Sequence, residues 1–237
     1  INNTIDNLLH KIEGAYADNT IRAYRRNLTN FQAYCQQTHQ TFLPATTDTL
    51  VGFIDHLLQQ NLSAHYIRRH MTAIAHLHRM SRYPDPTLDP EIKLAMRRVF
   101  RQQGRFQKQA YPIQQEQIKR MLSSLRDDLY GHRDRVLLLI AYENLLRRSE
   151  LVSLRMEDLK SLDHPQYCAK ILLRKSKTDP FKEGRWLYLT QETYTAINAW
   201  VKAAKIKQGY LLRGIRKGNH LTQQLTGCQV NKILKKR

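Results

Sequence analysis

The sequence predicts a mainly α-helical protein of two domains, with a small β-sheet in the second domain. Three observations lead to this prediction. Apolar residues recur at helical spacing over most of the chain, two β-like runs lie close together in its second half, and a polar, basic stretch divides the chain near residue 105. We place an N-terminal domain at residues 1–103, a linker at 104–113 and a C-terminal domain at 114–237.

The N-terminal domain is predicted to be a compact helical bundle. Each predicted helix begins near a polar capping residue or a proline and carries apolar side chains three or four positions apart. The helices are predicted at residues 20–34, 50–58, 64–80 and 91–101. Pro44 and the Tyr83–Pro86 segment separate them, because proline lacks the amide hydrogen that a helix interior requires.

The C-terminal domain is predicted to be mostly helical with one small β element. Helical spacing covers residues 115–125, 134–142, 150–154 and 193–204, and a further helix is expected within 221–234. Runs typical of strands occur at 167–173 and 186–189. The basic turn 174–185 connects these two runs.

The charge of the chain is strongly positive in both halves. Lys and Arg number 39 against 20 Asp and Glu, which gives a formal net charge of +19. Residues 1–105 contribute +5 and residues 106–237 contribute +14. Such a surface attracts polyanions, of which nucleic acid is the usual one in a cell. An anionic membrane surface is the competing partner. Because both parts are basic, both can contact one long anionic ligand.

Several classes of protein are excluded by what the sequence lacks. The three cysteines, Cys35, Cys168 and Cys228, are far apart and form no CxxC pair, which argues against a disulfide framework or a zinc site and favours a reducing cytosol. No apolar run reaches the roughly 18 residues that a membrane span needs. The ten histidines show no paired ligand spacing, so we expect no metal site.

The most specific motif is the segment 140–151, IAYENLLRRSEL. It resembles the first catalytic-arginine box of the tyrosine recombinase, or phage integrase, family, which is commonly written T-G-L-R-x-S-E-L. The resemblance implies that Arg147 is the catalytic arginine and Glu150 the acidic residue that supports it. Leu145 stands where most of the family has glycine. The Cre-like branch has a similar leucine-containing box, so this departure favours that branch.

A second motif, RKSKT at residues 174–178, lies between the two β-like runs. In the family, a lysine on this β-hairpin turn acts as a general acid, and Lys177 is the matching position, with Lys175 as the alternative. Further segments resemble Cre-like members in the same order along the chain. They are Phe42–Ala45, Ile67–His70, Leu77–Arg79, Met96–Arg98, Tyr210–Leu212 and Arg216–Gly218.

The resemblance implies a SAM-like core-binding domain followed by the tyrosine-recombinase catalytic fold. Together these would clamp double-stranded DNA at a specific recombination site, as a homotetramer that exchanges strands through a Holliday junction and a 3′-phosphotyrosine intermediate. No cofactor, metal, small-molecule substrate or membrane partner is implied, and a cytoplasmic, nucleoid-associated location is expected. The family's second box and its nucleophilic tyrosine would follow Arg237, and no tyrosine follows Tyr210. We therefore assign no nucleophile and expect a catalytic domain that lacks its C-terminal part.

The chemistry of the candidate catalytic residues suits cleavage of a phosphodiester. Arginine remains charged at cellular pH, and its planar fork donates two parallel hydrogen bonds to an anion. Such a cation, fixed in advance, stabilises the negative charge of a pentacovalent transition state. Glu150 follows Arg147 by about one helical turn and can orient it, although an ordinary helix carboxylate is an equal interpretation. A lysine on a turn can protonate the leaving 5′ oxygen.

Other basic and aromatic residues are candidate DNA contacts. The resemblance places DNA-reading helices at 20–34 and 64–80, while arginines near the linker and residues of the basic turn are expected to hold phosphates. The simpler interpretation is that all of them form solvated faces. The candidates are Arg22, Arg25, Arg26, His65, Tyr66, Arg68, Arg69, Arg97, Arg98, Arg101, Arg105, Arg174 and Lys175.

Two alternative functions remain open at the level of sequence. The first is a DNA-binding, architectural or regulatory protein of the same fold that has lost cleavage, which the missing second box motivates. The second is an enzyme similar to type IB topoisomerases, which share the chemistry and act without a particular target sequence. The separate N-terminal helical domain argues against the topoisomerase.

Overall fold

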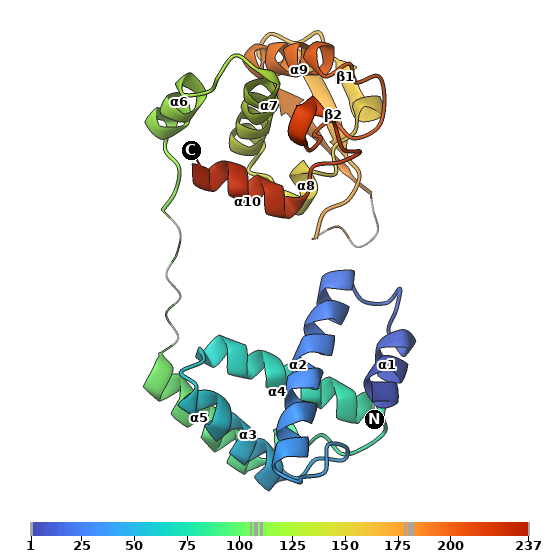
Figure 1. The fold of residues 1–237 in the computed structure, drawn as a ribbon, viewed down its shortest axis with the longest axis vertical. Coiled ribbons are helices and arrows are strands. Elements are labelled where there is room, and N and C mark those ends of the chain that lie inside the picture. The colour runs from blue at the N-terminus through green and yellow to red at the C-terminus, as the bar shows by residue number, and fades with distance from the viewer. Residues whose placement is uncertain are drawn as a thin grey trace. The chain divides into compact units, whose positions relative to one another are not determined.

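The computed structural model describes residues 2–104, 106, 109, 111–177, 179 and 183–236. The chain divides into two compact units, residues 1–109 and 110–237, both drawn in Figure 1. The described structure is mostly helical with a small three-stranded sheet, which confirms the predicted fold class. Among these residues, no helix has both the length and the apolar character to cross a membrane.

The N-terminal unit is a helical bundle around one apolar core. Its elements are α1 (Asn2–Lys11), α2 (Asp18–Gln37), α3 (Thr47–Gln59), α4 (Ala64–Met80), the short 3-10 helix η1 (Pro86–Leu88) and α5 (Pro90–Gln103). Phe31 of α2 and Phe53 of α3 lie at the centre of the core, with ring centroids 5.0 Å apart. Side-chain caps begin α3 and α4: Thr46 accepts a hydrogen bond from the amide of Thr49, and Ser63 accepts one from the amide of Tyr66.

Helix α1 is an element that the sequence analysis did not predict. Its residues Ile5, Leu8 and Leu9, with Ile12 just beyond its end, recur at helical spacing and are all buried. They were overlooked because the helix is short and otherwise polar. A helix of this length is marginal by itself in water and depends on burial of its apolar side against α2 and α4.

A fully buried histidine joins α4 to the loop that precedes α3. In His78, Nδ1 lies 2.8 Å from the carbonyl oxygen of Ile74, and Nε2 accepts a hydrogen bond from the amide of Ala45 at 2.9 Å. Because Nε2 accepts, Nδ1 carries the hydrogen and the ring is neutral. Burial lowers the pKa of His78, and it also lowers the pKa of the buried His70 and His76.

The C-terminal unit packs its sheet against helices. Its elements are α6 (Gln115–Ser123), α7 (Leu129–Asn144), α8 (Arg148–Leu151), η2 (Met156–Asp158), β1 (Leu159–Ser161), β2 (Ala169–Leu173), β3 (Arg185–Leu189), α9 (Gln191–Ala203), η3 (Lys217–Asn219) and α10 (Gly227–Lys236). The strands are antiparallel in the order β1-β2-β3, and Ile171 lies opposite Leu187. Helices α7 and α9 lie beside the sheet (Figure 1). Buried residues of β2 and β3 share a core with these helices and with the fully buried Trp200.

Two differences from the predicted elements have local causes. Helix α7 begins at Leu129 and not at residue 134, because Asp128 caps it by accepting a hydrogen bond from the amide of Gly131 at 2.8 Å. The polar first turn hid this start, and just after it Arg133 and Asp134 form a buried ion pair. Strand β1 was not predicted, because its three residues are mostly exposed and show no alternation.

The buried histidines predict that acid destabilises the N-terminal unit. A folded-state pKa below the ordinary value of about 6.5 means that the unfolded chain binds the proton first as the pH falls. The stabilisation from a neutral His78 is therefore complete above that pH and is lost below it. We expect His78→Leu to cost about 1–3 kcal/mol near pH 7.5, because it leaves the amide of Ala45 without its acceptor. The same change should flatten the dependence of unfolding free energy on pH between 7.5 and 5.

Urea unfolding of the wild-type protein and the variant at several pH values measures this effect. His39→Asn is the matched control, because that histidine is exposed in the same unit and lies outside its apolar core. An equal pH dependence in His78→Leu and wild type would contradict the assignment.

Candidate active site

The segment 140–151, which resembles the catalytic-arginine box, runs from the last turn of α7 to the end of α8. Leu145 adopts a left-handed conformation there, with φ 49° and ψ 44°, and its side chain is exposed. This conformation lets the chain reverse direction so that Arg147 precedes the first turn of α8. Glycine usually occupies such a position because it lacks a Cβ atom, and the left-handed conformation costs other residues about 1–2 kcal/mol. The local geometry is thus the one that glycine favours, although leucine provides it here.

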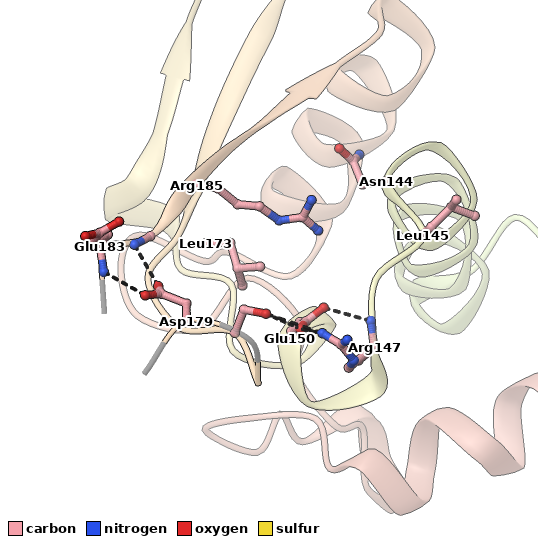
Figure 2. Close-up of a pocket in the computed structure, with 10 residues that line it drawn as sticks. Asn144, Leu145, Arg147, Glu150, Leu173, Asp179, Glu183 and Arg185 are labelled. Atoms are coloured by element: carbon pink, nitrogen blue, oxygen red, sulfur yellow. Dashed lines mark hydrogen bonds and ion pairs between the residues drawn. The ribbon is translucent and has the colours of Figure 1, made fainter. Parts of the chain in front are cut away.

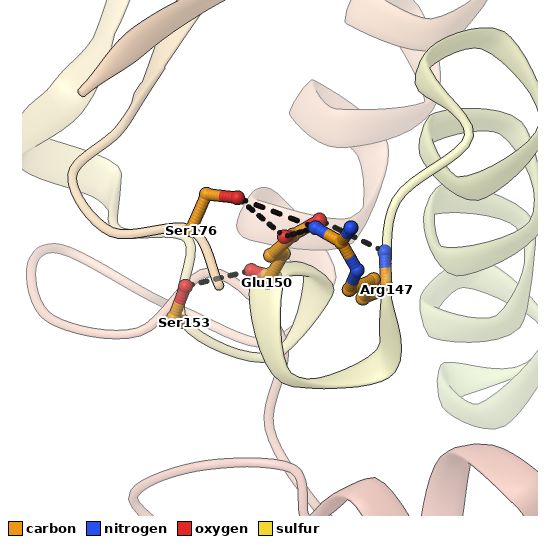
Figure 3. Close-up of polar contacts among 4 residues, drawn as sticks. All are labelled: Arg147, Glu150, Ser153 and Ser176. Atoms are coloured by element: carbon orange, nitrogen blue, oxygen red, sulfur yellow. Dashed lines mark hydrogen bonds and ion pairs between the residues drawn. The ribbon is translucent and has the colours of Figure 1, made fainter. Parts of the chain in front are cut away.

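Glu150 binds Arg147 through both of its carboxylate oxygens. Oε2 accepts a hydrogen bond from the backbone amide of Arg147 at 3.0 Å, and Oε1 accepts one from Nη1 of its guanidinium at 2.8 Å. The first bond satisfies an amide at the start of α8, and the second fixes the direction of the guanidinium (Figure 3). The resemblance predicts that Glu150 supports Arg147, and in the structure Glu150 contacts Arg147 directly.

The Glu150 carboxylate is buried and ionised. Burial by itself raises its pKa, but hydrogen bonds from the amide and side chain of Arg147 and from Ser176, together with the charge of Arg147, lower the pKa overall. Only 4% of the Glu150 side chain is exposed, compared with 50% of the Arg147 side chain. The carboxylate thus anchors a guanidinium that still reaches solvent.

The turn between β2 and β3 meets this pair through Ser176. The Ser176 hydroxyl donates a hydrogen bond to Oε1 of Glu150 at 2.9 Å and accepts one from Nη1 of Arg147 at 3.3 Å (Figure 3). Lys177 is the next residue, and its side chain is exposed, as is that of Lys175. The structure therefore brings the turn that carries both candidate lysines to the arginine box.

Arg174 has a carboxylate partner. Its Nε donates to Oδ2 of Asp158 at 2.7 Å and its Nη2 donates to Oδ1 at 2.8 Å, which ties the base of the turn to η2. These bonds raise the pKa of Arg174. This predicted DNA contact therefore already holds an ion pair within the protein.

An open pocket of about 810 Å³ surrounds the pair of Arg147 and Glu150 (Figure 2). Its lining comes from the end of α7, from α8 and from both ends of the β2–β3 connection. The lining residues are Asn144, Leu145, Arg147, Glu150, Leu173, Ser176, Asp179, Glu183, Gly184 and Arg185. Among them, Ser176 and Arg185 were not proposed as site residues from the sequence. The alternation of β3 was the available signal for Arg185, because it places this residue on the same face as the buried Leu187 and Leu189.

In the N-terminal unit, the candidate DNA contacts lie on three helices. Arg22, Arg25 and Arg26 are exposed on α2, Arg68 and Arg69 are exposed on α4, and His65 and Tyr66 are half-buried there. Arg97, Arg98 and Arg101 are exposed on α5, whereas Arg105 lies outside the described residues.

Helices α2 and α4 bring several of these side chains together. Asn30 of α2 donates to the hydroxyl of Tyr66 at 3.1 Å, and Asn27 donates to the carbonyl oxygen of Arg69 at 3.2 Å. Burial is the main cause that lowers the pKa of His70. The positive charges of Arg26 and Arg69 lower it further, so both arginines lie near His70. Besides Tyr66, two candidates have side-chain partners within the unit: Arg25 pairs with Asp6, and the ring of His65 meets the ring of Phe100 edge to face.

Comparison with protein families identifies both units. Residues 8–82 match the family described as "Phage integrase, N-terminal SAM-like domain", and residues 112–237 match the "Phage integrase family". An integrase/recombinase xerD homolog of Selenomonas ruminantium is 32% identical over 238 residues, which cover 95% of this chain and 68% of that protein. Recombinase cre of Escherichia phage P1 is 23% identical over 211 residues, which cover 86% of this chain and 61% of that protein.

Solved structures share the fold. The Tn1549 transposon integrase in complex with circular intermediate DNA aligns with a TM-score of 0.58 at 15% identity, over 98% of this chain and 78% of that one. The chain spans about two thirds of the length of the two curated relatives above. On the family matches and the relative that is 32% identical, the chain belongs to the phage integrase family of tyrosine recombinases.

Proposed function

We propose that the protein is a site-specific DNA recombinase that cuts and rejoins duplex DNA through a 3′-phosphotyrosine intermediate and a Holliday junction. The single observation that carries this proposal is the contact of Ser176 with both Arg147 and Glu150. It holds a lysine-bearing turn against a fixed guanidinium, so that a phosphate-binding cation and a proton donor can act on the same phosphodiester.

Arg147 is suited to bind the non-bridging oxygens of that phosphodiester. Its Nη1 is bonded to Glu150 and Ser176, while half of the side chain is exposed to the pocket. The remaining N–H groups of the guanidinium can donate to a phosphate. Because Glu150 fixes this orientation before substrate binds, little reorganisation is needed as negative charge grows in the transition state.

Lys177 is our candidate for the general acid that protonates the leaving 5′ oxygen, with Lys175 as the alternative. Both are exposed neighbours of Ser176, which lines the pocket, while the lysines themselves are not among the lining residues. The alkoxide of a 5′ hydroxyl is a poor leaving group, so a proton supplied at this position lowers the barrier to cleavage.

The two units divide the work in this proposal. Residues 1–103 form a core-binding domain whose α2 and α4 present Arg22, Arg26, Arg68 and Arg69 to DNA, and the α5 arginines hold phosphates. Residues 114–237 form the catalytic domain, with 104–113 as the linker. By analogy with relatives that are named recombinases, the full-length protein would assemble as a homotetramer on double-stranded DNA in the nucleoid.

The first prediction concerns cleavage itself. Full-length protein incubated with a random-sequence duplex library should give SDS-resistant protein–DNA adducts, and sequencing the attached DNA should return one target site. Arg147→Gln should lower the rate of adduct formation by about 10²–10³-fold, because it removes a fixed cation from the transition state. Specific binding by the wild-type protein without any adduct would instead support a DNA-binding protein that does not cleave.

The second prediction assigns the general acid. Lys177→Ala should slow cleavage of ordinary DNA by about 10²–10⁴-fold. The variant should approach wild-type rates on DNA with sulfur in place of the bridging 5′ oxygen, because a thiolate leaves without being protonated. Lys175→Ala is the matched control from the same turn. If the sulfur substrate rescues Lys175→Ala and not Lys177→Ala, then Lys175 is the acid.

The third prediction concerns the surface of α2 and α4. Binding to the selected site should weaken in Arg26→Ala and in Arg69→Ala. If the lost contact is to a phosphate, the slope of log K against log salt should fall by about 0.9. If it is to a base, discrimination at one base pair should fall by about 1–3 kcal/mol. Lys11→Ala, which removes an exposed cation from α1, serves as the control. Unchanged affinity, salt dependence and specificity in both arginine variants would remove this surface from the DNA interface.

A further inference from the structure

Arg185 is a basic residue of the pocket that neither motif includes. It is the first residue of β3 and lies opposite Leu173, the last residue of β2. Strand alternation places it on the core side of the sheet, with Leu187 and Leu189. The sheet ends at Arg185, however, so its side chain extends past the apolar core into the pocket, towards the end of α7 (Figure 2).

The charges around the pocket give Arg185 a distinct position. Arg147 is bound by Glu150, and Asp179 accepts hydrogen bonds from the amides of Glu183 at 3.1 Å and Gly184 at 2.9 Å. Within the described ranges, the Arg185 guanidinium has neither a hydrogen bond nor an ion pair, and its side chain is exposed. Two arginines line the pocket, Arg147 and Arg185. Among the described residues, Arg185 is the one that forms no ion pair with a carboxylate.

A phosphodiester that enters this pocket needs such a cation. The carboxylates of Glu150, Asp179 and Glu183 all belong to the lining, and Glu150 already pairs with Arg147, so a second guanidinium in the lining strengthens its attraction for a phosphate. The pentacovalent transition state carries more negative charge than the ground state, which increases the demand for positive charge at the non-bridging oxygens. A free guanidinium can meet that demand with one or two charge-assisted hydrogen bonds.

We propose that Arg185 is a second phosphate-binding residue of the site and that it donates to a non-bridging oxygen of the scissile phosphodiester. The inference rests on the proposed recombinase function, because it takes DNA as the ligand. Arg147 supplies a cation whose direction is fixed by Glu150, and Arg185 supplies a cation that forms no ion pair among the described residues.

Neutral methylphosphonate linkages test this proposal through DNA binding. In the wild-type full-length protein, a methylphosphonate at the scissile position of the selected site should weaken binding, because it removes the charge that Arg185 contacts. In Arg185→Gln, the same substitution should cause several-fold less weakening, whereas methylphosphonates at other positions should act as in wild type. If the protein forms no covalent adduct, the site is selected by binding and scanned with single methylphosphonates; one position should then weaken wild-type binding several-fold more than it weakens binding by Arg185→Gln, so the measurement stays informative when the proposed chemistry fails.

Cleavage provides the second readout. Arg185→Gln should form adducts about 10²-fold more slowly than wild type on an ordinary phosphodiester, the loss expected when one fixed donor to a transition-state oxyanion is removed. On the scissile methylphosphonate, the two proteins should react at similar rates. Arg185→Lys keeps the charge and should recover part of the rate. Arg126→Gln is the matched control, because that arginine is exposed, pairs with Asp128 and lies outside the pocket.

The proposal is overturned if Arg185→Gln responds to every methylphosphonate as wild type does. It is also overturned if the variant cleaves the phosphodiester at the wild-type rate, or loses the same factor on charged and neutral substrates. If thermal unfolding shows that Arg185→Gln is not folded, Arg185→Lys is compared with wild type instead. Lysine donates with a different geometry, so the weakening of binding by a methylphosphonate should still differ from wild type only at the scissile position.

Discussion

The candidate site depends on one buried carboxylate. Glu150 accepts hydrogen bonds from the backbone and guanidinium of Arg147 and from the hydroxyl of Ser176. A buried charge without partners costs several kcal/mol, so these donors must stay in place for the fold to tolerate it. The start of α8, Arg147 and Ser176 are consequently held in one geometry. The chemistry that we propose for Arg147 and Lys177 requires this geometry to exist before DNA binds.

Local patterns were sufficient to predict most of the fold and part of the site. Helical spacing located the main helices, and the three-residue separation of Arg147 and Glu150 matched their contact. The sequence analysis named Arg174 as a DNA contact and left Arg185 out, although both are arginines of one basic turn. Their difference depends on a distant partner: Asp158 engages Arg174, while no described carboxylate engages Arg185. Only tertiary structure determines which cation of a basic segment remains free.

Leu145 illustrates how a departure from a motif can leave the site unchanged. The family pattern has glycine at this position, and the chain here still adopts the left-handed conformation that glycine favours. Packing of α7 on one side and the bonds between Arg147 and Glu150 on the other determine the path of the backbone. The strain of a left-handed leucine, about 1–2 kcal/mol, is smaller than the loss that would follow if those bonds were broken. The geometry of the turn is therefore imposed by its neighbours.

Pairing a catalytic guanidinium with a carboxylate has two opposing effects. The pair with Glu150 orients Arg147, but the negative charge of the carboxylate also weakens the attraction of Arg147 for a phosphate. A site that needs both orientation and positive charge can meet these needs with different residues. The pocket contains such a pair of arginines, one bound by a buried carboxylate and one exposed without an ion pair among the described residues. This arrangement is compatible with the anion binding that we propose for a pocket lined by three carboxylates: one of them orients a cation, while a second cation forms no ion pair among the described residues.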